Sequence, residues 1–217
     1  MKITIALLSF GCLLSTPAFA GVIALGQFDD FENGTAMGWA EGPPSPNPPV
    51  NIPDGGPLGA GDAYLQNVSD GSSGPGGRLA MFNRVQWTGD YLAEGIDSIE
   101  ANLANFGDTP LYMRIGVQGN PGERFASSNA IFLPADGAWH HVTFGLSASD
   151  LSLVSGIASL DDVLGEVQEL RILSREANPG WQADAIATTL GADNITAVPE
   201  PASALALGLA LVLLRRR

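Results

Sequence analysis

The sequence has few of the residues on which catalysis and covalent cross-links most often depend. It contains one cysteine, Cys12, and two histidines, His140 and His141. Two histidines cannot supply a three-histidine zinc site, and neither lies in a Gly-x-Ser-x-Gly or similar nucleophile motif. The glycine-rich stretch 71–77 lacks the lysine and the following helix of a phosphate-binding loop. We therefore expect no enzyme. A hydrolase that uses two of the many carboxylates is a minor alternative.

Positive charge is equally scarce. Between residues 21 and 197 there is no lysine, and six arginines face 22 acidic side chains, which gives a net charge of −16. Such a surface repels nucleic acid and anionic membranes, so we expect no nucleic-acid partner. The charge is compatible with divalent cations or with a neutral polysaccharide, and the solubility of an exported protein also explains it.

The N-terminus predicts export. Lys2 supplies a positively charged start, residues 3–14 supply an apolar stretch, and Ala18-Phe19-Ala20 is a small-x-small cleavage site. A lipoprotein signal would use Cys12 instead, but the usual leucine three positions ahead of it is missing. We predict a secretory signal peptide at residues 1–20. Its removal takes the only cysteine and leaves the mature chain without disulfides.

The C-terminus, residues 198–217, predicts a second sorting signal. A Pro-Glu-Pro motif, Val198, Pro199, Glu200 and Pro201, is followed by an apolar helix at residues 202–214 and a basic end, Arg215, Arg216 and Arg217. At ~1.5 Å per residue the helix spans roughly 20 Å, which is short of the ~30 Å hydrocarbon core of a membrane. Snorkelling arginines partly make up the difference and stay on the cytoplasmic side, so the bulk of the chain is expected outside.

This order of parts resembles the PEP-CTERM sorting signal of Gram-negative bacteria. The resemblance implies that an exosortase recognises residues 198–201, processes the chain near them and passes it to the cell envelope, the cell surface or the extracellular matrix. It also implies that the C-terminal helix contacts the inner membrane before processing. It says nothing of an activity.

Residues 21–197 are expected to form one domain. Leu111–Gln118 alternates apolar and polar residues as a half-buried strand does, and Ser159–Leu164 predicts a short helix with Ser159 as N-cap and Asp162 three residues on. Short β-rich runs separated by turn formers predict an all-β, jelly-roll-like β-sandwich. The runs are Gly21–Gln27, Asp62–Val68, Arg78–Gln86, Leu111–Gln118, Asn129–Leu133, Trp139–Leu146, Val167–Ser174 and Asn194–Ala197.

An acidic stretch near the start of this domain suggests a metal site. The run Phe31-Glu32-Asn33-Gly34, followed by Gly38-Trp39, resembles the opening of carbohydrate-binding modules with a galactose-binding-like jelly roll. The resemblance implies one structural Ca²⁺, held by an acid here and an aspartate on the last strand, because a jelly roll pairs its first and last strands. The matching residues are Asp30, Glu32 and Asp193. The alternative is a plain Asn-Gly turn with acids on its solvated side.

A second stretch combines aromatic and polar side chains. Trp87, Asp90 and Tyr91 are of the types that stack on sugar rings and bind hydroxyl groups, so they are the candidate ligand-binding residues. The alternative is that these rings are buried. Exposed aromatic rings around Trp87 and the proline-rich loop Pro43–Gly59 would favour a sugar site, and fully buried rings would favour a structural protein.

Taken together, the sequence predicts an exported surface or matrix protein that is a non-catalytic binding module for exopolysaccharide. A structural or adhesion protein without a sugar site is the main alternative. Ice binding is less favoured, because the sequence shows no repeat that would build a flat, regular face.

Overall fold

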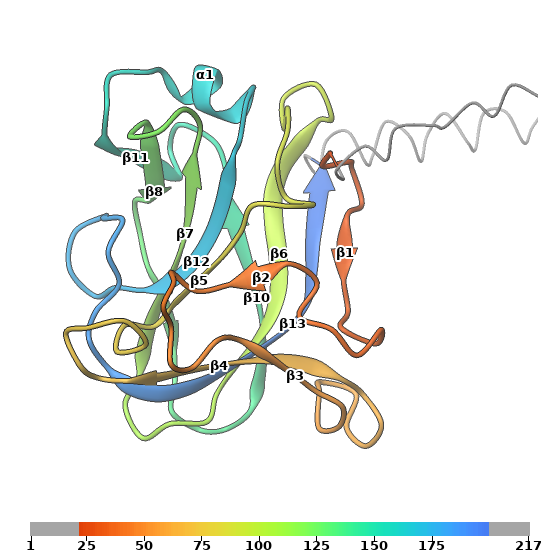
Figure 1. Ribbon diagram of the computed structural model, residues 1–217. Coiled ribbons are helices and arrows are strands. Elements are labelled where there is room, and N and C mark those ends of the chain that lie inside the picture. Colours follow the sequence, from red (N-terminus) through yellow and green to blue (C-terminus); the bar gives the residue numbers. More distant parts are fainter. Residues whose placement is uncertain (1–21, 200–217) are drawn as a thin grey trace, which may run out of the picture.

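The computed structural model describes residues 22–199 (Figure 1). The predicted signal peptide, Glu200 and Pro201 of the sorting motif, the apolar stretch 202–214 and the three terminal arginines lie outside the described residues. None of the helices within 22–199 has the length and apolar character needed to cross a membrane.

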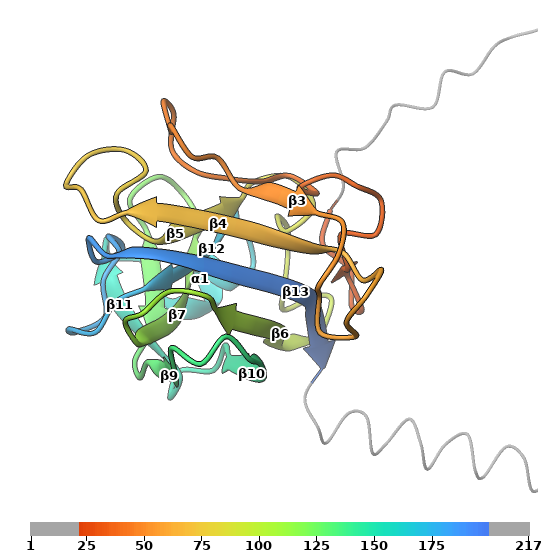
Figure 2. The same cartoon turned by 90° about the horizontal axis from the view of Figure 1, so that it is seen from below.

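The domain is a sandwich of two antiparallel sheets, as predicted (Figure 1). The six-stranded sheet has the order β10–β6–β13–β4–β3, with β1 beside β13, and Figure 2 shows β4, β13 and β6 side by side. Its strands are β1 (Phe28–Asp29), β3 (Val50–Ile52), β4 (Tyr64–Asp70), β6 (Ile96–Asn105), β10 (Trp139–Gly145) and β13 (Ala187–Pro199).

The seven-stranded sheet has the order β11–β8–β7–β12–β5–β2, with β9 paired to β7. Its strands are β2 (Trp39–Ala40), β5 (Ala80–Asn83), β7 (Leu111–Gln118), β8 (Arg124–Ser127), β9 (Ile131–Leu133), β11 (Leu151–Ser155) and β12 (Glu169–Ser174). The helix α1 (Leu160–Leu164) precedes β12. Ser159 and Asp162 form the predicted capping box, with both of its reciprocal hydrogen bonds present.

The core lies between the two sheets and is filled by alternate side chains of each strand. In β7 the predicted inward set, Leu111, Met113, Ile115 and Val117, is fully buried. Burying a side chain of this size contributes roughly 1.5–3 kcal/mol. Of the outward set, Arg114, Gly116 and Gln118 are buried as well and Tyr112 is half-buried, because residues 175–186 lie across that face. We call this segment the strap.

The two longest strands are the ones that the sequence indicates least clearly. β6 carries five polar residues and shows no clear alternation, and β13 contains Gly191 in its middle. A side chain at Gly191 would bring its Cβ within 2.8 Å of the Trp139 ring, so the outer face of β13 needs glycine there. β13 runs on through Val198 and Pro199, the first two residues of the predicted sorting motif.

One predicted strand is wrong. Residues 21–27 contain a turn, closed by a hydrogen bond from the Gln27 amide to the Ala24 carbonyl, with Gly26 at φ +80°. The first strand begins only at Phe28 and pairs with the last strand, β13, as the jelly-roll expectation requires.

The buried carboxylate of Asp29 joins this N-terminal strand to the rest of the core. Its Oδ2 accepts hydrogen bonds from the indole nitrogens of Trp39 (2.8 Å) and Trp87 (2.7 Å) and from the Gln86 amide (3.2 Å), while Oδ1 accepts from Gln27 (3.0 Å). Asp29 has no exposed surface. A buried charge is tolerated where donors surround it in this way.

We predict that Asp29→Ala lowers the free energy of unfolding by about 3–5 kcal/mol, because it leaves two indole N–H groups buried without an acceptor. Asp29→Asn should cost roughly 1–2 kcal/mol, since its remaining oxygen can still face both indoles while the Gln27 amide turns to accept from the new NH₂ group. Urea unfolding followed by tryptophan fluorescence measures both. A loss below about 1 kcal/mol for Asp29→Ala would contradict this role.

Candidate ligand-binding groove

The predicted aromatic ligand site is corrected by the structure. Trp87 and Tyr91 have no exposed surface, so neither ring can stack on a sugar. The Trp87 indole donates to Asp29, and the Tyr91 hydroxyl donates to the Trp87 carbonyl at 2.9 Å. Asp90 is exposed, but its carboxylate caps a turn by accepting from the Ala93 amide. By the criterion set out above, this region supports the structural alternative.

The predicted calcium residues lie in one neighbourhood. Asp193 is buried on the outer side of β13, and its Oδ1 has no hydrogen-bond partner within the described chain, while Oδ2 accepts from Asn194 at 3.0 Å. Burial raises the pKa of Asp193 to about 7, and the charges of Asp62, Asp30 and Glu32 add to the rise. The unpaired oxygen is the kind of group that a cation would satisfy.

These acids do not form a complete metal site on their own. No cluster of three or more Asp, Glu, His or Cys side chains within residues 22–199 could hold a metal ion. One Glu32 oxygen already accepts a hydrogen bond from the Ala63 amide at 2.8 Å, and one Asp62 oxygen accepts one from the Leu58 amide at 2.6 Å. A calcium ion here would need backbone carbonyls or water in addition to Asp193.

A groove of about 360 Å³ opens on the outer face of the seven-stranded sheet. Its floor is Ala80 and Phe82 of β5 with Arg171 of β12, and the strap closes one side through Gln182 and Ala183. Two loops complete the wall. They are Glu41–Pro43, which leads into the predicted proline-rich loop Pro43–Gly59, and the glycine loop Gly74–Gly76.

The buried Glu169 fixes the polar wall of this groove. Its Oε2 accepts hydrogen bonds from Nε (2.7 Å) and Nη2 (2.6 Å) of Arg84. Its Oε1 accepts hydrogen bonds from Nε (2.8 Å) and Nη2 (2.7 Å) of Arg171. Glu169 is 1% exposed. Burial lowers the pKa of Arg171, and the Glu169 carboxylate opposes that shift. Both guanidiniums lie over the Phe82 ring, 4.3 Å (Arg84) and 5.6 Å (Arg171) from its centre.

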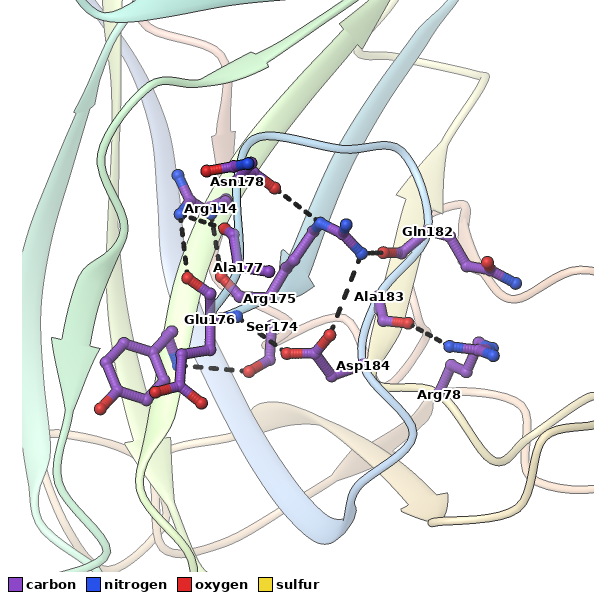
Figure 3. A network of polar contacts seen from close by, with 11 residues as sticks. Arg78, Arg114, Ser174, Arg175, Glu176, Ala177, Asn178, Gln182, Ala183 and Asp184 are labelled. Atoms are coloured by element: carbon purple, nitrogen blue, oxygen red, sulfur yellow. Dashed lines mark hydrogen bonds and ion pairs between the residues drawn. The ribbon is translucent and has the colours of Figure 1, made fainter.

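The strap is held to the sheet by arginine side chains that donate to backbone carbonyls (Figure 3). Arg114 alone donates to the carbonyls of Arg175, Glu176 and Ala177 in the strap and to those of Ser127 and Ser128 at the end of β8. Arg78, which precedes β5, donates to the Ala183 carbonyl at 2.7 Å, and within the strap Arg175 donates to the carbonyls of Asn178 and Gln182. These bonds satisfy carbonyls that an irregular segment would otherwise leave unpaired.

Trp181 packs the middle of the strap onto the sheet. Its ring lies over Gly116 of β7, where a Cβ atom would come within 2.8 Å of the ring. The guanidiniums of Arg171 and Arg124 lie 4.3 and 4.9 Å from the ring centre, and Arg171 also donates to the Trp181 carbonyl. Trp181 therefore packs between charged side chains and does not offer an open ring face to a ligand.

Sequence reasoning missed this groove as a site. Arg84 lies close in sequence to the aromatic run, and Arg171 lies two positions after the acid that it pairs with, Glu169, so neither has a pattern that marks a ligand site. Phe82 and Gln182 had no distinguishing pattern. The signal that could have found the groove was the pair of glycine- and proline-rich loops flanking the strand that contains Phe82, since loops on a rigid scaffold often carry binding residues.

No family model matches this chain, and no curated protein matches it. Solved structures do share the fold. The family 11 carbohydrate-binding module from Clostridium thermocellum, solved in complex with a β-1,3-1,4-mixed-linked tetrasaccharide, superposes with a TM-score of 0.52 at 15% identity, covering 81% of this chain and 97% of the module. This similarity confirms the predicted jelly-roll β-sandwich.

An exo-β-agarase gives a TM-score of 0.54 at 14% identity over 82% of this chain. The match covers 25% of the agarase chain, so this protein spans about a quarter of that enzyme's length. At these identities the similarity extends to the fold and not to a shared ligand or reaction.

Proposed function

We propose that this protein is a non-catalytic polysaccharide-binding module and that the groove over Phe82 is its binding site. The observation that carries the proposal is an open, polar-walled groove between two loops on a carbohydrate-binding-module fold. Its volume of about 360 Å³ lies in the range of ligand sites. Arg84 and Gln182 offer donors to hydroxyl groups, and the walls are fixed before a ligand arrives.

A structural or adhesion role without a sugar site is the second candidate. The complete burial of Trp87 and Tyr91 favours it, because the rings that a sugar site would use are part of the core instead. The two candidates differ in whether the groove is needed for retention on polysaccharide.

We predict that Ala80→Trp abolishes retention on polysaccharide in affinity electrophoresis, because the added ring fills the floor of the groove. Thr143→Trp adds the same ring to an exposed position of β10 in the other sheet and should leave retention unchanged. The panel contains neutral and acidic polymers. If neither the parent protein nor Thr143→Trp is retained on any polymer, the structural candidate replaces the binding module.

We also propose that one Ca²⁺ binds beside Asp193, with Asp30, Glu32 or Asp62 supplying further charge and with carbonyl or water oxygens completing the shell. The unpaired Oδ1 of Asp193 supports this proposal. Calcium would have a structural role, joining the last strand to the N-terminal segment.

We predict that millimolar Ca²⁺ raises the melting temperature by about 5–10 °C relative to EDTA, since a ligand at ~100 times its dissociation constant adds roughly 2.7 kcal/mol. Without metal, Asp193 binds a proton more tightly in the folded state than in the unfolded state. Its contribution to stability therefore falls as pH rises from about 4 to about 7.

Calcium replaces that proton, so the calcium effect should be larger at about pH 8 than at about pH 5. Asp193→Asn should abolish both the calcium shift and this part of the pH dependence. Glu94→Gln, which removes an exposed acid from a turn elsewhere, is the matched control. Equal melting temperatures in calcium and EDTA at the higher pH would refute the site.

Finally, we propose that the chain is exported through the inner membrane of a Gram-negative bacterium and sorted by an exosortase to the cell envelope, surface or extracellular matrix. The order of residues 198–217 supports this proposal: the Pro-Glu-Pro motif, the apolar stretch and the three arginines. Val198 and Pro199 of the motif still pair with β6 at the end of β13, so a processing enzyme would act at the edge of the folded domain.

We predict that Glu200→Ala with Pro201→Ala leaves the protein unprocessed in the inner-membrane fraction, because the apolar stretch stays attached as an anchor. Ser203→Ala, a small change outside the motif, is the control. Immunoblots of cell fractions report both size and location. Release of the double variant in processed form would contradict exosortase recognition of the motif.

A further inference from the structure

The cationic side chains of the domain gather on one side. All six arginines within residues 22–199 lie on or beside the outer face of the seven-stranded sheet, either in its strands, next to them or in the strap. They are Arg78, Arg84, Arg114, Arg124, Arg171 and Arg175. The same residues include 22 acids, so the positive charge is concentrated against a strongly negative background.

Three of these arginines line the groove, and two of them keep donors free. The Arg84 side chain is 54% exposed although it pairs with Glu169. Arg78 has no ion-pair partner among the described residues, and its Nε is buried without an acceptor; only its Nη1 is engaged, at the Ala183 carbonyl. Arg171 is fully engaged by Glu169 and the Trp181 carbonyl.

The acids near the groove do not cancel this charge. Glu169 and Glu41 are the two carboxylates that face the three guanidiniums. Three guanidiniums outnumber these two carboxylates. The Glu41 Oε1 has no partner in the described chain, while its Oε2 accepts from Ser45. The groove is therefore positive in a protein whose net charge is strongly negative.

The groove offers little to a neutral sugar. Among the described residues that line it, Phe82 is the only aromatic one, is 9% exposed and lies under two guanidiniums. Stacking on an open ring face, which carries much of the affinity for neutral sugars, therefore has little surface to use here. What the groove presents is the guanidinium groups of Arg78 and the half-exposed Arg84, cationic N–H donors that suit carboxylate and sulfate oxygens.

We propose that the groove binds an anionic polysaccharide, whose sugar carboxylates or sulfate esters pair with Arg78 and Arg84. This inference rests on the proposed polysaccharide-binding function and names its ligand class. It departs from the expectation drawn from net charge, because the average over the whole surface hides a local site of the opposite sign.

The test uses two pairs of polymers, each a charged polymer and a neutral one with the same sugar backbone. They are polygalacturonate against its fully methyl-esterified form, and dextran sulfate against dextran, with binding measured by affinity electrophoresis and calorimetry. The full chain should bind at least one charged polymer about tenfold or more tightly than its neutral partner, with affinity falling as salt rises. Preference between the two charged polymers distinguishes carboxylate from sulfate.

Single substitutions test whether the preference for charged polymers depends on residues of the groove. Arg84→Gln should weaken binding of the charged polymer about tenfold and leave the fold intact, because Arg171 still pairs with Glu169. Arg124→Gln removes the same charge from the same sheet outside the groove and should change binding little. Glu41→Gln should strengthen binding, an effect that loss of structure cannot produce.

The outcomes distinguish a failure of the anionic-ligand proposal from a failure of the proposed binding function. Equal binding of charged and neutral partners, with retention still blocked by Ala80→Trp, would overturn the anionic ligand and leave the binding module standing. No binding of any polymer would overturn both. Equal losses in Arg84→Gln and Arg124→Gln would overturn the assignment to this groove, and thermal unfolding of each variant excludes misfolding as the cause.

Discussion

A charge that leaves water needs a partner, and this constraint governs both the core and the candidate site. The Asp29 carboxylate accepts from two indole N–H groups and two glutamine amides, and so ties the N-terminal strand to the sandwich. The Glu169 carboxylate pairs with two guanidiniums and holds them over Phe82. In each case one buried acid decides where the surrounding side chains point.

The same constraint explains how a few arginines organise the outer face of the seven-stranded sheet. Arg114 and Arg175 donate to strap carbonyls, and the strap in turn buries the outer side of β7 (Figure 3). The groove at the edge of this layer therefore has walls that are already fixed. A ligand would then lose little affinity to the ordering of side chains. Arginine serves here first as a structural donor and then, where donors remain, as a candidate ligand contact.

The sequence predicted the sandwich, the pairing of the first and last strands and the capped helix, because each depends on local pattern or on chain order. It failed where tertiary contacts decide. Trp87 has the character of a sugar-binding residue until its indole is seen to donate to the buried Asp29, 58 positions away. Gly191 has the character of a strand breaker until Trp139 is seen to pack over it. The groove stayed hidden because Arg84, Arg171 and Gln182 come from separate segments and share no spacing.

The most direct test of the account is an NMR titration of the protein with a short galacturonate oligosaccharide, following backbone amides and arginine Nε–H signals. We predict shifts confined to the groove: the Nε–H signals of Arg84 and Arg78, and the amides of residues 74–76 and 182–183. The Nε–H signal of Arg114, whose donors are engaged by the strap, should stay unchanged. Shifts centred outside the groove would contradict the claim that this groove is the binding site.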